Sequence, residues 1–399
     1  MSPQASGRSG AYPSSSAEVP GPTSSGSQVA PTPLSSIVPV PTSQFAPPSV
    51  PPAHYTSSLG RALQKALSGV RTKNAFPGMQ AAIVFPDGHV WSGSSGAAIT
   101  GKKSVTATTL FAAGSVSKMF VAALIGRLSM AGTIGLDDPL SKYVPSFPNA
   151  ANITIRELLN HTSGIQDLFE NLGKAIESNP SKTWTAQQVL ARIGPPWFTP
   201  GNGYHYSNTD FILLGMVIEQ VTGQTVAALT RTWFLQPLGL THTYLQTEEQ
   251  VKGNEAHGYM PATLPATAPT DNWDGVMLPY TSEATAVGVS GAYVSTATDL
   301  ALWANALYDG DILDQATLAS MVDITPTLQF KSPYHGLGFE EMSIDNQVAW
   351  GHQGHLDGFW SAVEYFPASH VTIVVLTNAE WAKNSIIPAV ASLAAIAIG

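Results

Sequence analysis

The chain has 399 residues but no cysteine, and only 11% of its residues carry a charge. The absence of cysteine excludes disulfides, thiolate metal sites and a cysteine nucleophile. The formal net charge is −9, and no basic cluster of the kind that binds phosphates is present. Nucleic acid is therefore not an expected partner.

Long hydrophobic runs are also missing. The last apolar run, residues 385–398, contains Pro388 and is too short to span a bilayer, so it predicts a helix packed on a sheet. The N-terminus lacks the basic and apolar segments of a signal peptide. We expect a secreted or periplasmic protein whose export signal is absent from this sequence, and a cytoplasmic location stays open.

Residues 1–53 differ from the rest of the chain. They contain two charged side chains, Arg8 and Glu18, and 12 of the 30 prolines, mixed with serine and threonine. Such a segment cannot bury enough surface to offset its ordering entropy. The composition predicts a disordered Pro/Ser/Thr-rich tether, followed by one folded domain over residues 54–399.

Both ends of this domain predict strands. Helical spacing of leucines in "HYTSSLGRALQKALSGV" predicts a first helix, and two apolar runs around Pro86-Asp87-Gly88 then predict a β-hairpin. Near the C-terminus, a strand ending at Phe366 and another from Val371 repeat this format, and a final helix follows. The four strands indicate one antiparallel sheet.

The middle of the chain predicts helices with Ser, Thr or Asp near their starts. The segments are "SVSKMFVAALIGRLSMAG", "TIRELLNHTSG", "TAQQVLARIG", "TDFILLGMVIEQVTG" and "TDLALWANALYDG". The expected fold class is α+β, with a mainly helical lobe (about 115–280) inserted into an antiparallel sheet lobe flanked by helices (about 54–110 and 285–399).

Ser115 and Lys118 in "FAAGSVSKMF" form the first candidate site. Residues three apart share one helix face, and the N–H groups at a helix start would stabilise an alkoxide at Ser115 and disfavour protonated Lys118. A neutral lysine can accept the serine proton. A chain of this composition contains about one Ser-x-x-Lys by chance, so the pair needs companions.

Two further triplets provide them. Tyr206-Ser207-Asn208 follows a Gly/Pro-rich loop, from which a tyrosine could relay a proton and an amide could orient the lysine. His352-Gln353-Gly354 lies on a predicted strand edge, where a glycine would admit a substrate backbone.

The order, placement and spacing of the three triplets resemble the penicillin-binding protein and serine β-lactamase superfamily. The likeness is greatest to the branch with D-alanyl-D-alanine carboxypeptidases, class C β-lactamases and related esterases. Other stretches that resemble this branch, in its order, include "LDDPLSKYVPSFP", "ITIRELLNHTSGI", "PLGLTHT", "GAYVSTATDLALWANAL" and "YHGLGF". The resemblance covers most of residues 54–399 and implies a β-lactamase/transpeptidase-like fold.

The resemblance also implies roles for individual residues. Ser115 would be the acylated nucleophile and Lys118 its base, while Tyr206 would pass the proton to the leaving group and activate water. Asn208 would hold Lys118 and the substrate amide. The backbone N–H groups of Ser115 and His355 would form the oxyanion hole.

The third triplet departs from the family pattern. His352 stands where many relatives have lysine, Gln353 replaces a hydroxyl residue that helps to bind a substrate carboxylate, and Gly354 completes the substrate-binding triplet. Glu340 and Glu341 follow "GLGF", where some carboxypeptidases have arginine, so like charge would repel a substrate carboxylate. The protonated imidazole of His355 could offset this at low pH.

Several other residues could have either a functional or a structural role. For His161 in "LLNHTSG", the sequence favours a hydrogen bond that stabilises the loop over a role as general base. We slightly favour packing in the core over the lining of a substrate cleft for Trp184, Trp197 and Phe198. His352 and His355 lack a third metal ligand nearby in the sequence, so neither metal nor cofactor is expected.

The sequence therefore predicts a serine hydrolase that forms an acyl-enzyme on an ester or amide bond of a small ester or peptide-like substrate. Esterase and D-amino-acid peptidase types fit the departures from the family pattern better than a D-alanyl-D-alanine carboxypeptidase or a β-lactamase, which stay as alternatives. A non-catalytic module that binds peptides or cell-wall fragments is the alternative from another class. The sequence does not indicate an oligomeric state.

Overall fold

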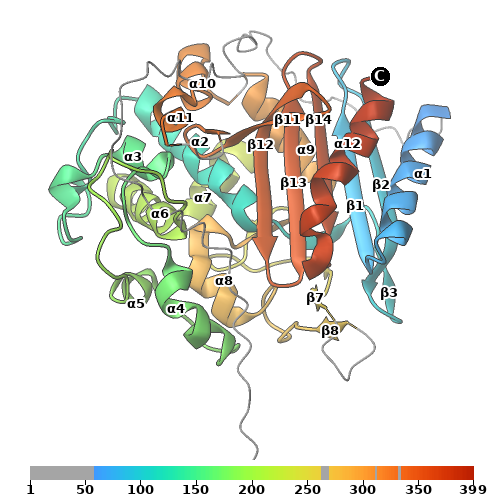
Figure 1. Cartoon of the computed structure of the whole chain (residues 1–399), viewed down its shortest axis with the longest axis horizontal. Helices are drawn as coiled ribbons and strands as arrows, with labels where there is room; N and C mark the ends of the chain where they lie inside the picture. The colour runs from blue at the N-terminus through green and yellow to red at the C-terminus, as the bar shows by residue number, and fades with distance from the viewer. Residues whose placement is uncertain (1–57, 262–268, 311, 331–333) are drawn as a thin grey trace, which may run out of the picture. The chain divides into compact units, whose positions relative to one another are not determined.

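An antiparallel sheet of eight strands occupies the right side of the computed structural model in Figure 1. The structure describes residues 58–261, 269–310, 312–330 and 334–399, so the predicted tether lies outside the described residues. In spatial order the strands are β10 (Tyr334–His335), β11 (Glu340–Ile344), β12 (Gln347–Leu356), β13 (Phe359–Phe366), β14 (Val371–Thr377), β1 (Gly78–Val84), β2 (Val90–Ile99) and β3 (Lys103–Ser104).

The two ends of the folded region meet in the middle of this sheet. β1 pairs with β14 in a register that places Ala81 opposite Val375, and the predicted hairpins β1–β2 and β13–β14 continue the sheet on either side. The prediction that both chain ends supply one antiparallel sheet is confirmed.

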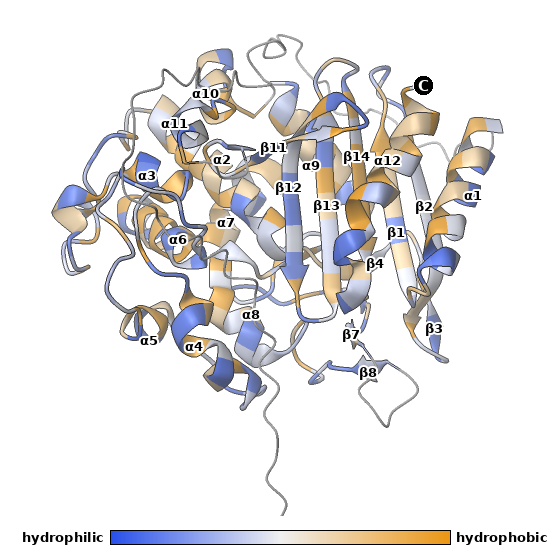
Figure 2. Ribbon diagram, viewed as in Figure 1, coloured by the Kyte–Doolittle hydropathy of each residue, from blue (hydrophilic) through white to orange (hydrophobic). Residues whose placement is uncertain are grey.

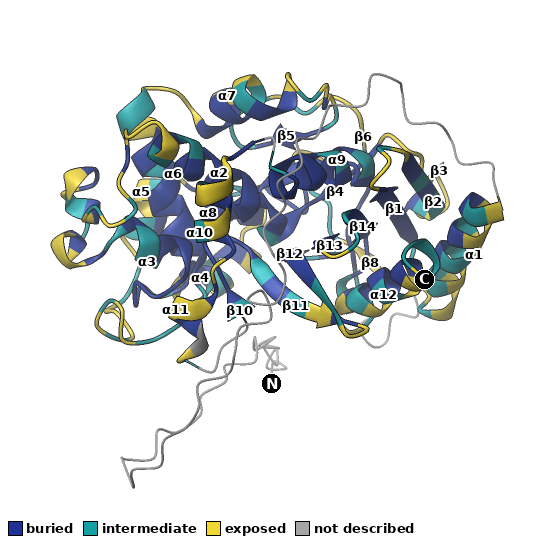
Figure 3. Cartoon of the chain, turned by 90° about the horizontal axis from the view of Figure 1, so that it is seen from above, coloured by how far each residue is buried: buried dark blue, intermediate teal, exposed yellow. Residues whose placement is uncertain are grey.

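Helices cover both faces of the sheet, which explains why β1 and β14 are buried along their whole length. α1 (Ser58–Lys73) and α12 (Ile386–Ala397) pack on one face, and α9 (Ala297–Tyr308) packs on the other. Figure 3 shows buried residues along the central strands and exposed ones along the outer side of α1. Alternate side chains of each strand therefore enter two separate cores.

A mainly helical region interrupts the sheet in sequence and lies to its left in Figure 1. Its helices are α2 (Ser117–Met130), α3 (Ile155–Leu159), α4 (Leu168–Glu177), α5 (Ala186–Leu190), α6 (Asn208–Thr222), α7 (Val226–Thr230) and α8 (Thr281–Val287), and α10 (Gln315–Met321) and α11 (Thr325–Leu328) follow α9. This arrangement confirms the predicted α+β fold class.

Short strands join the helical region to the large sheet. β5 (Tyr244–Leu245), β9 (Tyr293–Ser295), β4 (Thr109–Ala112) and β6 (Asn254–Glu255) form a second sheet in that order, and β7 (Tyr259–Met260) pairs with β8 (Thr270–Asp271). β4 leads directly into the segment that carries Ser115. The small sheet therefore fixes where that segment enters the core.

α2 is buried on nearly all sides, as its apolar composition requires. The ring of Phe120 stacks between those of Tyr293 and Trp303, at centroid distances of 4.5 and 4.4 Å. Figure 2 shows β12 as a hydrophilic strand beside the hydrophobic β13. Polar side chains thus collect where β12 faces the start of α2.

Among the described residues no single helix is both long and apolar enough to cross a membrane. One bent pair of helices, Asn208–Thr222 with Val226–Leu235, satisfies the length and composition criteria together.

Candidate active site

Ser115 lies on a short 3-10 turn, Gly114–Val116, that precedes α2. The α-helix itself begins at Ser117, two residues later than the sequence suggests. Gly114 has a φ of +55°, and a Cβ atom there would lie 2.5 Å from the backbone nitrogen of His355. Only glycine allows β12 to pack this closely against the turn that carries Ser115.

Lys118 connects this turn to two other parts of the chain. Its Nζ lies 3.2 Å from Ser115 Oγ, and it donates hydrogen bonds to Asn208 Oδ1 at 2.6 Å and to the Ser290 carbonyl oxygen at 3.0 Å. A neutral amine has two N–H donors and one lone pair. With both donors engaged elsewhere, the lone pair faces the Ser115 hydroxyl.

Burial lowers the pKa of Lys118 and so favours the neutral amine that this arrangement requires. Desolvation of the fully buried ammonium lowers its pKa to about 7, although the negative charges of Asp167, Glu340 and Asp210 oppose the shift. A substantial fraction of Lys118 is therefore neutral at neutral pH. The sequence prediction invoked the helix N-terminus for this shift, whereas burial is the largest cause.

Asn208 is held by Asp167, which sequence reasoning missed. Asp167 Oδ2 accepts hydrogen bonds from the Asn208 backbone N–H at 2.6 Å and from its side-chain Nδ2 at 2.9 Å. Since Nδ2 donates to Asp167, Oδ1 of the amide must face Lys118. Asp167 also caps α4 by accepting from the backbone N–H of Phe169. An aspartate before "LFENLGKAI" is a helix-start signal that could have identified it.

Tyr206 lies in the loop before α6, as predicted, while Asn208 is the first residue of that helix. The phenol oxygen is buried and makes no hydrogen bond of good geometry among the described residues, yet it is close enough to Ser115 to interact with its hydroxyl. Burial raises the pKa of Tyr206 well above its usual value, and the Ser115 contact opposes this in part. Tyr206 therefore stays a neutral phenol that can donate a proton.

His161 supports the Tyr206 loop from behind. Its Nδ1 accepts a hydrogen bond from the backbone N–H of Ser207 at 3.2 Å, and its ring lies 4.4 Å from that of Tyr206. Burial lowers the pKa of His161 well below its ordinary value, so the imidazole is neutral. These contacts agree with the predicted loop-stabilising role.

His352 lies on β12 and is buried beside Lys118. Burial, with the positive charge of Lys118 as a second cause, lowers the pKa of His352 to about 3. Its Nδ1–H donates to the Gln353 carbonyl oxygen, and its Nε2 is buried without a hydrogen-bond partner among the described residues. β11 pairs with β12 only as far as Gly351, so β11 leaves this part of the β12 edge uncovered.

Two predictions about the rest of this strand need correction. A Cβ atom on Gly354 would overlap the carbonyl oxygen of Ala113, so the close approach that this glycine permits is made by the chain itself. The His355 imidazole pairs with Glu380 at 2.8 Å and packs on Trp360, so it is not free to supply charge to a carboxylate pocket. The predicted use of the His355 backbone N–H is unaffected.

Of the adjacent acids Glu340 and Glu341, only Glu340 faces the candidate site. Glu340 lies 3.5 Å from His335 Nε2 and 3.4 Å from the Gln353 backbone nitrogen, and its charge acts on both Lys118 and Tyr206. Glu341 is buried and accepts a hydrogen bond from the indole of Trp350. The expectation that both acids lie at the site is wrong for Glu341.

The expectation that His352 and His355 have no third metal ligand nearby is also wrong. Donor atoms of His352, His335 and Glu340 lie within 4.8 Å of one another, and the same holds for His355, Asp357 and Glu380. His335, Glu340 and Glu380 come from other parts of the chain, so sequence spacing could not reveal them, whereas Asp357 lies only two residues after His355.

The three aromatic residues differ in their environments. Trp184 is buried and donates its indole N–H to Ser282 Oγ, which confirms core packing. Trp197 is 56% exposed and stacks on His205, so the packing prediction is wrong for it. Phe198 is partly buried, and its backbone and ring close off the space beside Gly164 and Gly203.

A serine in contact with a buried lysine, next to a phenol, an amide and a strand edge, defines the class of serine hydrolases that act through Ser-x-x-Lys. A family model described as Beta-lactamase matches residues 63–385, and the chain belongs to this family. Penicillin-binding protein 4 of Amycolatopsis lactamdurans is 28% identical over 334 residues, which cover 79% of this chain and 84% of that protein.

Two solved structures are similar over nearly their full length. The D-amino acid amidase from Ochrobactrum anthropi SV3, complexed with L-phenylalanine amide, is 28% identical with a TM-score of 0.73, and the match covers 85% of this chain and 98% of that one. The D-stereospecific amidohydrolase from Streptomyces sp. is 26% identical with a TM-score of 0.70, covering 82% and 97%. The chain is an enzyme of the serine hydrolase type, as predicted.

Proposed function

We propose that the chain hydrolyses amides of amino acids, with preference for the D-configuration, through an acyl-enzyme on Ser115. The observation that carries the proposal is the contact between Ser115 Oγ and the buried Lys118 amine, whose pKa of about 7 leaves it able to accept a proton. The names of two structural neighbours, a D-amino acid amidase and a D-stereospecific amidohydrolase, support the choice of substrate class.

Acylation follows from these contacts. Lys118 takes the proton of Ser115 as Oγ attacks the substrate carbonyl carbon, and the carbonyl oxygen becomes an oxyanion. The backbone N–H groups of Ser115 and His355 would bind it, and the loss of one such donor typically costs about 3 kcal/mol. The Tyr206 phenol gives its proton to the leaving amine and recovers one from Lys118.

Deacylation reverses the proton transfers. Water takes the place of the leaving amine, Tyr206 and Lys118 together accept its proton, and hydroxide adds to the acyl carbon. Collapse of the second intermediate breaks the bond to Ser115 Oγ, which regains its proton from Lys118. Asn208, held by Asp167, keeps Lys118 in place throughout.

Glu340 favours an amide over a substrate that ends in a carboxylate. Its negative charge stands close enough to affect both Lys118 and Tyr206, so it would repel the free carboxylate of a D-alanyl-D-alanine peptide or a penicillin. A carboxamide has no such charge. The carboxypeptidase and β-lactamase alternatives are disfavoured for this reason.

The test compares D-phenylalanine amide with L-phenylalanine amide, a p-nitrophenyl ester, a chromogenic cephalosporin and a peptide ending in D-Ala-D-Ala. We expect kcat/KM for the D-amide to exceed that for the L-amide and the peptide by about tenfold or more, equivalent to about 1.4 kcal/mol. Intact-mass measurement should detect an acyl adduct on the wild type and none on Ser115→Ala. Preferred turnover of the cephalosporin would favour the β-lactamase alternative, and neither turnover nor adduct with any compound would favour a binding module.

A further inference from the structure

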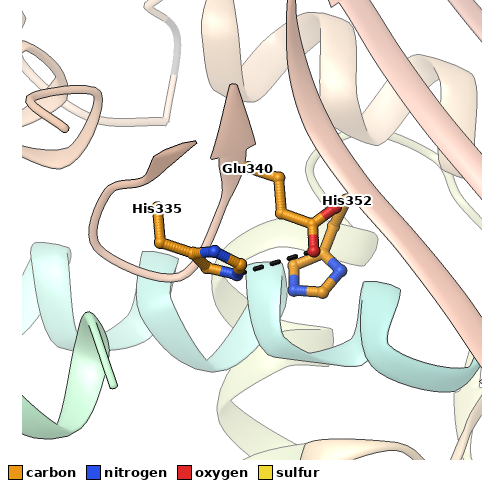
Figure 4. Close-up of side chains that lie close together, drawn as sticks. All are labelled: His335, Glu340 and His352. Carbon is orange, nitrogen blue, oxygen red and sulfur yellow. Dashed lines mark ion pairs between the residues drawn. The ribbon is translucent and has the colours of Figure 1, made fainter. Parts of the chain in front are cut away.

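His335, Glu340 and His352 converge from three neighbouring strands at the edge of the large sheet (Figure 4). His335 ends β10, Glu340 starts β11 and His352 lies on β12. One donor atom from each residue lies within 4.8 Å of the other two. Both imidazoles are 1% exposed, while the Glu340 side chain is 16% exposed, so the cluster meets solvent on the glutamate side.

The hydrogen bonds of His352 determine which of its nitrogens faces the cluster as an acceptor. The Gln353 carbonyl oxygen can only accept, so Nδ1 must carry the proton and Nε2 must present a lone pair. That Nε2 is fully buried and has no hydrogen-bond partner among the described residues. A buried, uncompensated lone pair is costly unless something binds to it.

His335 is held in a similar way. Its Nδ1 lies 2.9 Å from the Tyr204 hydroxyl, which can either donate to Nδ1 or accept its proton, and in the second arrangement Nε2 presents a lone pair. Nε2 lies 3.5 Å from Glu340 Oε1, which is longer than a charge-assisted hydrogen bond of about 2.7–2.9 Å. The same 3.5 Å is close to the ligand separation in a tetrahedral zinc site, about 3.4 Å for bonds of about 2.0–2.1 Å.

We propose that His335 Nε2, His352 Nε2 and the Glu340 carboxylate bind a divalent transition metal ion, zinc foremost. Two imidazole nitrogens and one carboxylate are a donor set that zinc accepts with one position left open. The Gln353 carbonyl and the Tyr204 hydroxyl act as the outer partners that orient metal-binding imidazoles through their second nitrogen.

Bound metal is an inhibitor of the hydrolase, not its cofactor. The Tyr206 ring centroid lies 5.9 Å from that of His335 and 6.2 Å from that of His352, so the ion would occupy the space next to the proton-donating phenol. It would also place a double positive charge near Lys118 and neutralise Glu340. Each effect opposes binding of an amine-containing substrate in the same space.

A second cluster provides the matched control. His355, Asp357 and Glu380 satisfy the same spacing, but their donor atoms are already engaged. His355 pairs with one Glu380 oxygen, the backbone N–H of Gly358 donates to the other, and Asp357 accepts from Tyr280. These partners satisfy the cluster without an ion.

The experiment measures zinc binding directly, on untagged full-length protein, by competition with a chromophoric chelator and by the visible absorption of bound Co²⁺. His335→Asn can keep the Tyr204 contact through its amide while removing Nε2, and His355→Asn is the control. We expect one high-affinity ion per chain, an affinity at least about tenfold weaker in His335→Asn, and no change in His355→Asn. The zinc concentration that halves hydrolysis should shift by the same factor.

Glu340→Gln is the second ligand variant, and thermal unfolding reports whether each variant is folded. If His335→Asn does not fold, the loss of affinity in Glu340→Gln decides the question. Absence of binding to the wild type, unchanged affinity in a folded ligand variant, or an equal loss in His355→Asn would each overturn the proposal. The binding measurement does not depend on turnover, so it stands apart from the test of the proposed function.

Discussion

Replacement of Lys118 by methionine tests the link between burial and catalysis in the candidate site. Burial moves the pKa of Lys118 from 10.5 to about 7. At about 1.36 kcal/mol per pH unit, this shift corresponds to a destabilisation of about 5 kcal/mol at pH values below 7. Methionine fills a similar volume without a charge, so the variant does not have this cost.

The sign of the pH dependence follows from proton binding. The unfolded chain holds the Lys118 proton up to about pH 10.5, whereas the folded protein releases it near pH 7. Between these values the unfolded state binds more protons, so wild-type stability rises with pH by about 1.4 kcal/mol per unit. The free energy of unfolding of Lys118→Met, relative to wild type, should therefore fall by about 2 kcal/mol between pH 7 and pH 9.

The change with pH of the stability difference between Lys118→Met and wild type is more informative than its value at one pH. Methionine leaves Asn208 Oδ1 and the Ser290 carbonyl oxygen without their donor, which costs about 1–3 kcal/mol for each buried acceptor. That cost does not change with pH. Denaturant unfolding at several pH values separates the two contributions, and Lys102→Met, at an exposed lysine, serves as the control with a constant difference.

The ionisation of Lys118 should also determine how kcat/KM of the wild type depends on pH. Below about pH 7, Lys118 is protonated and cannot accept the Ser115 proton, so kcat/KM should fall about tenfold per pH unit. A stability difference between Lys118→Met and wild type that stays constant from pH 7 to pH 9 would refute the reasoning. So would full activity in the wild type at pH 5.

Three other variants test neighbouring contacts. Tyr206→Phe should lower kcat for an amide by about 10²–10⁴, and less for a p-nitrophenyl ester whose leaving group needs no proton; steady-state kinetics with equal losses would contradict the relay role. Asp167→Asn removes a charge that raises the pKa of Lys118, so the acidic limb of the kcat/KM profile should move to lower pH, whereas an unchanged limb would contradict the coupling. Gly354→Ala places a Cβ against Ala113 and should lower the thermal unfolding temperature strongly, while Gly69→Ala, with open space around it on α1, should raise stability by up to about 1 kcal/mol; equal effects would contradict the packing.

Local patterns in the sequence were enough to predict the elements that build the sheet. The leucines at helical spacing form α1, and the Pro-Asp-Gly turn joins β1 to β2. The prediction that Ser115 and Lys118 share a face survives a later helix start, because residues three apart also align on a 3-10 turn. Each of these features depends on neighbours in the chain.

Asn208 was predicted to hold Lys118, but the other groups that fix these two side chains could not be predicted from neighbours in the chain. Ser290 contributes a backbone carbonyl from 172 residues away, and a carbonyl has no sequence signature. Asp167 and Asn208 are 41 residues apart and meet only because α4 and α6 start side by side. His335 lies in the family-like stretch "YHGLGF", but its proximity to Glu340 and His352 depends on the order of β10, β11 and β12 in the sheet.

The position of Trp197 was predicted wrongly for a different reason. Its size predicts burial, but the loop between α5 and α6 places it on the surface, where its indole N–H donates to Glu170 and its ring stacks on His205. The hydrogen bond and the stacking give the ring polar and aromatic partners without a core. Residue type alone does not distinguish this arrangement from packing.

One physical cause acts on all three ionisable groups at the centre of the site. Burial favours the neutral amine of Lys118, the neutral phenol of Tyr206 and the neutral imidazole of His352. In its neutral form each group can donate or accept a proton, which the proposed transfers from Ser115 to Lys118 and from Tyr206 to the leaving amine require. The acid Glu340 stands at the margin of the site, where its side chain is partly exposed. The dry centre therefore performs proton transfer, and the margin discriminates among substrates by charge.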